Sequence, residues 1–135
     1  MIYLTRKEHF NAAHQLSNPE WDLAKNELVF GKCANKHFHG HNYDLYVTVK
    51  GMPDKDTGFI MNVKDLSRVI KTEVCLLLDH KNLNIDVVEL KGLMVSTENL
   101  ALFIWKKLIP HIKGCQLHCI KLYETENIYV EYFGE

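Results

Sequence analysis

The clearest periodicity in the chain runs over residues 43–49, YDLYVTV. Tyr43, Leu45, Val47 and Val49 fall on one side of an extended chain, and the residues between them fall on the other. This alternation predicts a strand with one buried face. A sheet that is apolar on one face has to bury that face against a second layer.

The other periodic segments fix the order of elements around this strand. Partial alternation predicts a first strand at residues 2–16, and β-rich runs predict a closing hairpin at 117–123 and 128–133. Capping residues followed by apolar helical stripes predict helices at about 63–78 and 97–109. Residues 17–35 have no clear period and are interpreted as a long loop, and residues 59–61 as a short hairpin partner.

The order strand, strand, helix, helix, strand, strand contains no βαβ alternation. We therefore expect an α+β fold, with an antiparallel four-stranded sheet and two helices on one face. A length of 135 residues, with 47% hydrophobic and 24% charged side chains, is typical of one folded domain. The expected domain spans residues 1–135.

Charge and composition exclude several classes of partner. Sixteen basic and seventeen acidic side chains give a net charge of −1, so no basic excess attracts nucleic acid or anionic lipid. The N-terminal residues lack an apolar signal region, and no segment reaches the ~18 apolar residues of a membrane span. We expect a cytoplasmic protein whose four cysteines are thiols, metal ligands or nucleophiles rather than disulfides.

A histidine cluster immediately precedes the clearest strand. His39 and His41 share one face if the strand already begins at His39, because side chains repeat every two positions. His14 lies on the matching face of the first strand and supplies a third imidazole if the two strands pair antiparallel. Three histidines bind Zn²⁺ and leave one coordination position open, as in catalytic zinc sites.

Other interpretations of these residues remain open. In one of these interpretations, the histidines are merely polar residues at the start of a strand. In another, Cys33 completes a closed structural zinc site with four protein ligands. His37 is in phase with His39 and His41, so the spacing also allows it as a ligand.

Two further groups of residues carry useful chemistry. Asp79 and His80 follow the first predicted helix, and an aspartate beside an imidazole suits proton transfer, although such a pair is often only a helix end. Glu124 stands at the head of the closing hairpin. A buried carboxylate there could accept paired N–H groups from a flat heterocycle, whereas most carboxylates at such turns are solvated.

A series of motifs along nearly the whole chain resembles the 6-pyruvoyl-tetrahydropterin synthase family, whose α+β unit is called the T-fold. The resemblance rests on seven segments: FNAAH at 10–14, FGKC at 30–33, HGHNY at 39–43, MNVKDL at 61–66, LDHKNL at 78–83, STEN at 96–99 and YET at 123–125. Their order and spacing make the resemblance highly specific.

The resemblance implies a role for each matching residue. It implies zinc ligation by His14, His39 and His41, catalysis by the thiol of Cys33, and proton transfer by Asp79 and His80. Glu124 would anchor the pterin ring through its N–H edge, and Ser96, Thr97 and Glu98 would be further pocket residues. Similar proteins are homohexamers, dimers of trimers, with sites at subunit boundaries, which would place Cys33 opposite Asp79 and His80 of a neighbouring chain.

The implied reaction converts 7,8-dihydroneopterin triphosphate to 6-pyruvoyl-tetrahydropterin with elimination of triphosphate. An alternative within the family is 6-carboxy-tetrahydropterin synthase of queuosine biosynthesis, which uses the same substrate and releases acetaldehyde. Five residues separate Cys33 from His39, and relatives of the queuosine type often have a shorter gap, so the pyruvoyl product is favoured. An alternative of another class is a non-catalytic module stabilised by zinc.

Overall fold

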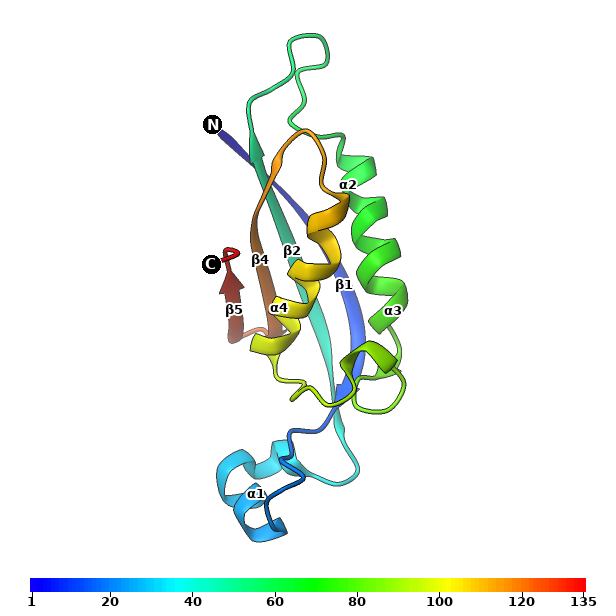
Figure 1. Cartoon of the computed structure of the whole chain (residues 1–135), viewed down its shortest axis with the longest axis vertical. Coiled ribbons are helices and arrows are strands. Elements are labelled where there is room, and N and C mark those ends of the chain that lie inside the picture. The colour runs from blue at the N-terminus through cyan, green and yellow to red at the C-terminus, as the bar shows by residue number, and fades with distance from the viewer.

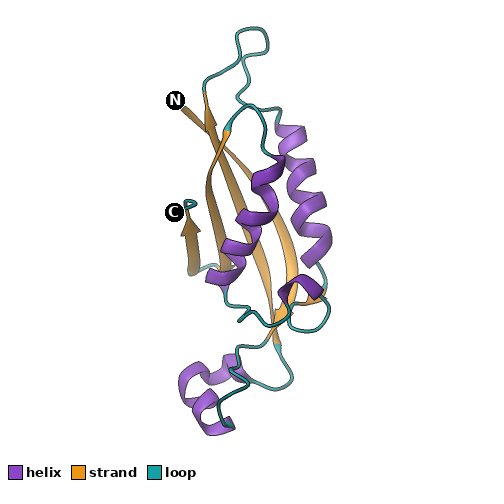
Figure 2. Ribbon diagram, in the orientation of Figure 1, coloured by secondary structure: helices purple, strands orange, loops and turns teal.

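A five-stranded sheet forms one layer of the molecule, and helices cover one of its faces (Figures 1 and 2). The computed structural model describes all residues from Met1 to Glu135. The strand order is β3-β1-β2-β4-β5, and every neighbouring pair is antiparallel except β1 and β3. The strands are β1 (Ile2–His14), β2 (His39–Gly51), β3 (Lys81–Asn82), β4 (Gln116–Thr125) and β5 (Ile128–Tyr132).

Two long helical segments pack on the sheet. The first is a continuous run of α2 (Val63–Ile70), a π-helical stretch η2 (Lys71–Cys75) and α3 (Leu76–Leu78), and the second is α4 (Thr97–Leu108). Side-chain caps start both of them: Asn62 accepts a hydrogen bond from the N–H of Lys64 at 2.9 Å, and Ser96 accepts one from Asn99 at 3.3 Å. None of the helices combines the length and hydrophobicity needed to cross a bilayer.

The remaining helices are short. A helix α1 (Leu23–Phe30) with a 3₁₀ turn η1 (Gly31–Ala34) lies at the end of the molecule, apart from the sheet (Figure 1). The other 3₁₀ turns are η3 (Val88–Leu90) and η4 (Ile109–His111).

The α+β class, the mostly antiparallel sheet and the helix ending at Leu78 are confirmed, whereas the strand count was wrong. The fifth strand, β3, is only two residues long, and a strand this short has no readable period. It forms where the N–H of His80 donates to the carbonyl of Asn11 at 2.6 Å and the N–H of Leu83 donates to that of Ala13 at 2.8 Å.

Two segments were also interpreted wrongly. The long loop expected at 17–35 contains α1, whose apolar Leu23 and Leu28 are exposed, so the sequence shows no amphipathic stripe. Its only buried residue is Asn26, whose side chain bonds to the backbone of Asn18. Residues 59–61 form no strand: Phe59 is exposed, and its carbonyl closes a turn by accepting from Asp54.

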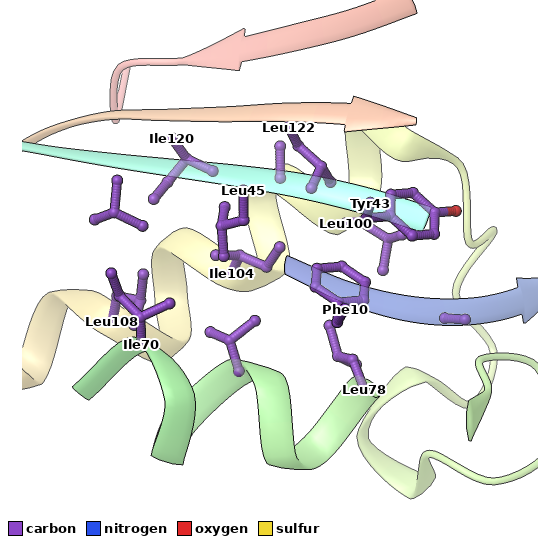
Figure 3. Close-up of a cluster of buried hydrophobic side chains, with 14 of the residues drawn as sticks. Phe10, Tyr43, Leu45, Ile70, Leu78, Leu100, Ile104, Leu108, Ile120 and Leu122 are labelled. Carbon is purple, nitrogen blue, oxygen red and sulfur yellow. The ribbon is translucent and has the colours of Figure 1, made fainter. Parts of the chain in front are cut away.

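The apolar core lies between the sheet and the two long helical segments (Figure 3). Alternate residues of β1 and β2 contribute to it, including Phe10, Tyr43 and Leu45, which are almost fully buried. The same face of these two strands continues beyond Phe10 and Tyr43 to the histidines. The packed core therefore holds in place the strand ends that carry the candidate site.

Candidate metal centre

Pairing of β1 with β2 brings three imidazoles together. The register sets His14 opposite His39 and Ala12 opposite His41, so all three histidines face the helical layer. The ring centroid of His14 lies 4.5 Å from that of His39 and 5.2 Å from that of His41. The rings of His39 and His41 are 4.9 Å apart.

The buried polar atoms that lack a hydrogen-bond partner lie together around these three imidazoles. Six buried side-chain nitrogen or oxygen atoms of the chain have no hydrogen-bond partner: His14 Nε2, His39 Nδ1 and Nε2, His41 Nε2, the Tyr43 hydroxyl and Thr97 Oγ1. They come from the end of β1, the start of β2 and the first residue of α4. Such atoms are rare in native proteins because each is costly to bury, so their clustering indicates a site that binds a ligand.

The carboxylate of Glu124, in β4, completes the group. Its Oε1 lies 3.0 Å from Nε2 of His41 and 3.4 Å from Nε2 of His14, contacts that lack hydrogen-bond geometry. One ligand atom from each of the four residues lies within 4.8 Å of the others. The imidazole of His14, aided by that of His41, holds the pKa of Glu124 below its usual range although burial opposes this, and the Thr97 hydroxyl makes a smaller contribution.

The chemistry of these donors fits a divalent metal ion. Nδ1 of His14 lies 2.7 Å from the carbonyl of Val95, which requires its proton and leaves a lone pair on Nε2. Burial lowers the pKa of His39, reinforced by the other two imidazoles, and burial lowers that of His41 against the charge of Glu124. Neutral imidazoles are the form that Zn²⁺ binds, so three nitrogen ligands and a nearby carboxylate are available to it.

Cys33 lies beside this group and not within it. It is half-buried in η1, and its carbonyl accepts a 2.9 Å hydrogen bond from the N–H of Leu16. Its thiol is not among the four converging ligands. Burial raises the pKa of the buried Tyr43, the charge of Glu124 adds to this, and the Cys33 side chain is close enough to this phenol to act in the same direction.

Asp79 and His80 lie at the other edge of β1, next to Asn11. Asp79 Oδ1 accepts the N–H of Asn11 at 2.8 Å, a bond that holds the pKa of Asp79 below its usual range, and Oδ2 lies 3.0 Å from Nδ1 of His80. The His80 side chain is 83% exposed. The pair lines a separate cavity of about 460 Å³ with His9 and Asn42, so one chain alone does not bring it to the three histidines.

The remaining predicted residues differ in their relation to the site. Thr97 is buried with its hydroxyl free, whereas Ser96 caps α4 and Glu98 is exposed. His37 is exposed in a turn, outside the converging group. The sequence interpretation missed the Tyr43 hydroxyl, although its alternation already placed Tyr43 on the face that carries His39 and His41.

Fold and site together define a class: a small α+β protein with a candidate metal centre of three histidines and one glutamate on a mostly antiparallel sheet. Comparison with known proteins then identifies the family. Residues 3–135 match the family model described as 6-pyruvoyl tetrahydropterin synthase. The chain belongs to this family.

Individual relatives cover nearly the whole chain. The 6-pyruvoyl tetrahydrobiopterin synthase of Dictyostelium discoideum is 46% identical over 134 residues, which is 99% of this chain and 97% of the relative. The human protein of the same name is 39% identical over 132 residues, with coverage of 98% and 91%. The structure of Caenorhabditis elegans 6-pyruvoyl tetrahydropterin synthase superposes with a TM-score of 0.93 at 30% identity, covering 99% of this chain and 96% of that one.

Proposed function

We propose that this chain is a zinc-dependent 6-pyruvoyl-tetrahydropterin synthase, a lyase that converts 7,8-dihydroneopterin triphosphate to 6-pyruvoyl-tetrahydropterin and releases triphosphate. The observation that carries the proposal is the convergence of three imidazoles with unpartnered nitrogens on one carboxylate. Membership of the family supports the choice of reaction and of a pterin triphosphate as substrate.

In this proposal His14, His39 and His41 hold the zinc ion. Bound zinc supplies a Lewis acid that stabilises negative charge on the oxygens of the substrate side chain. The carbonyl of Val95 keeps the His14 ring in the tautomer that offers Nε2. Burial keeps His39 and His41 neutral, so their nitrogens remain available near neutral pH.

The proton transfers are assigned to residues of this chain. The Cys33 thiolate removes a proton from a side-chain carbon of the substrate. Asp79 orients His80, whose imidazole returns a proton along the side chain. Because one chain does not bring Asp79 and His80 to the histidines, their role requires a neighbouring subunit. This supports an oligomer, for which we propose the homohexamer of two trimers that the family resemblance implies.

We assign the substrate-binding roles to residues that lie around the three histidines. The position of Glu124 against the imidazoles favours contact with donor groups near the metal end of the substrate, in addition to the N–H edge of the pterin ring. The buried Thr97 hydroxyl lies close enough to Glu124 to lower the pKa of that carboxylate, and Ser96 and Glu98 flank Thr97 at the start of α4.

The test is incubation of zinc-loaded protein with 7,8-dihydroneopterin triphosphate. The proposal predicts 6-pyruvoyl-tetrahydropterin and triphosphate as products. Acetaldehyde together with a 6-carboxy-pterin would instead identify the queuosine-pathway activity. No turnover of this substrate would contradict both.

Replacing Cys33 separates catalysis from a structural zinc site. Cys33→Ala should retain zinc and lose turnover, because the thiol lies outside the converging ligands. Loss of zinc and of stability would indicate a closed structural site and contradict the catalytic role. Cys75→Ala is the matched control, since Cys75 lies in η2 and should leave both properties intact.

A further inference from the structure

Tyr43 is a buried tyrosine whose hydroxyl no protein group uses. The residue has 0% relative exposure, and its ring stacks on that of Phe10 at a centroid distance of 4.9 Å. Figure 3 shows the hydroxyl oxygen at the end of the ring that points away from Leu45, Leu122 and the other labelled core side chains. The oxygen is buried and has no hydrogen-bond partner.

The surroundings of this hydroxyl are those of the candidate metal centre. The Tyr43 ring lies 5.6 Å from that of His41 and 6.3 Å from that of His14, with both imidazoles nearly perpendicular to it. Four of the other five unpartnered atoms belong to the three histidines, and the fifth is the hydroxyl of Thr97. Neutral imidazole nitrogens that bind a metal and an ionised Glu124 carboxylate have no proton to offer a ligand, whereas the phenol of Tyr43 and the hydroxyl of Thr97 do.

Core packing does not account for the hydroxyl. Phe10 is directly opposite Tyr43 in the sheet and fills its half of the stacked pair with an unsubstituted ring. A phenylalanine at position 43 would preserve the same stacking without a buried, unpaired O–H. A buried, unpaired polar group that lowers stability is expected at a site where a bound ligand supplies the missing hydrogen-bond partner.

We propose that the Tyr43 hydroxyl donates a hydrogen bond to an oxygen of the substrate held beside the three imidazoles. This inference rests on the proposed function, in which negative charge develops on the side-chain oxygens of the substrate. A donor already fixed in a buried site stabilises such charge without reorganising during the reaction. Tyr43 is thereby a catalytic residue that donates a hydrogen bond and keeps its proton.

The test compares Tyr43→Phe with wild type in three measurements: thermal unfolding in the presence of a chelator, zinc affinity, and turnover of 7,8-dihydroneopterin triphosphate. The metal-free variant should unfold at the same temperature as wild type or higher, because it loses only an unpaired group. Its zinc affinity should stay within about twofold, and its kcat should fall by about 10²-fold, the usual effect of removing one such donor. Tyr46→Phe is the control, since Tyr46 lies on the same strand and its ring packs against Tyr123, on the face away from the core.

Each outcome bears on the proposal. A fall in kcat of about tenfold or more, with the fold intact, supports hydrogen-bond donation to the substrate. A smaller change in kcat, or a metal-free variant less stable than wild type, overturns it, because the hydroxyl would then serve packing or a structural water. An inactive wild type would instead refute the proposed function, so the two failures are distinguishable.

Discussion

Replacing His39 with leucine should make the metal-free protein more stable than wild type. With zinc bound, wild type should be the more stable of the two. Both ring nitrogens of His39 are buried without a partner. A buried unsatisfied polar group costs about 1–3 kcal/mol, and leucine fills a similar volume without polar atoms. The metal-free variant should therefore gain about 1–3 kcal/mol. For a chain of this size about 3–4 °C corresponds to each kcal/mol, so its melting temperature should rise by roughly 3–12 °C.

Zinc should reverse this order. At a zinc concentration about 1,000 times its Kd, the wild type gains about 4 kcal/mol from binding. The variant has lost one of its three imidazoles and should gain little at the same concentration. Urea unfolding with a chelator and then with excess zinc measures both effects.

His118→Leu is the matched control for this experiment. His118 lies in β4 against the rings of Tyr3 and Phe133, outside the candidate metal centre, so zinc should stabilise this variant as it does the wild type. Two results would refute the reasoning: a metal-free His39→Leu protein less stable than wild type, or equal stabilisation of both by zinc.

Other predictions concern the polar groups of the fold and their pH dependence. Glu8→Gln should lower the free energy of unfolding by about 1–3 kcal/mol, because the buried Glu8 carboxylate accepts hydrogen bonds from Ser67 at 2.5 Å and from Arg6 at 2.9 Å. Urea unfolding measures this change, and unaltered stability would contradict the prediction. Because the pKa values of His39 and His41 are lowered in the folded chain, the unfolded chain binds more protons than the folded chain as the pH falls below about 6.5, and the stability of the metal-free protein should fall with it. A stability that does not change with pH in this range would argue against buried neutral rings. Zinc affinity should weaken over the same acidic range as the imidazoles protonate, which calorimetric titration can follow, and affinity independent of pH would exclude a three-histidine site.

Much of the candidate site follows from the period of a strand. Side chains two positions apart share a face, so the positions of His39, His41 and Tyr43 along one strand were sufficient to place them together. Antiparallel pairing of the first two strands then brought His14 opposite His39. The alternation along each strand can be read from the sequence, and antiparallel pairing of the two strands was the one further assumption.

Glu124 shows where this reasoning stopped too early. Ile120 and Leu122 are buried, and the same alternation continues to Glu124. The polar residues after Tyr123 were interpreted as a turn, yet β4 extends to Thr125, with an irregular register against β5. Such irregularities depend on how strands meet in space, so the sequence did not reveal that this carboxylate reaches the histidines.

Elements without a pattern of their own were also missed. Leu23, Leu28 and Val29 of α1 are exposed, and a two-residue strand such as β3 exists only because the backbone after α3 bonds to β1. The separation of Asp79 and His80 from the three histidines within one chain likewise follows from tertiary structure. No spacing in the sequence specifies whether two motifs meet in the same subunit.

X-ray absorption at the zinc edge of the zinc-loaded wild type tests the metal centre most directly. We expect three imidazole nitrogens at about 2.0–2.1 Å, with oxygen or nitrogen in the remaining coordination and no sulfur shell. A sulfur neighbour at about 2.3 Å, or fewer than three imidazoles, would contradict a site built by His14, His39 and His41 with Cys33 left free to react.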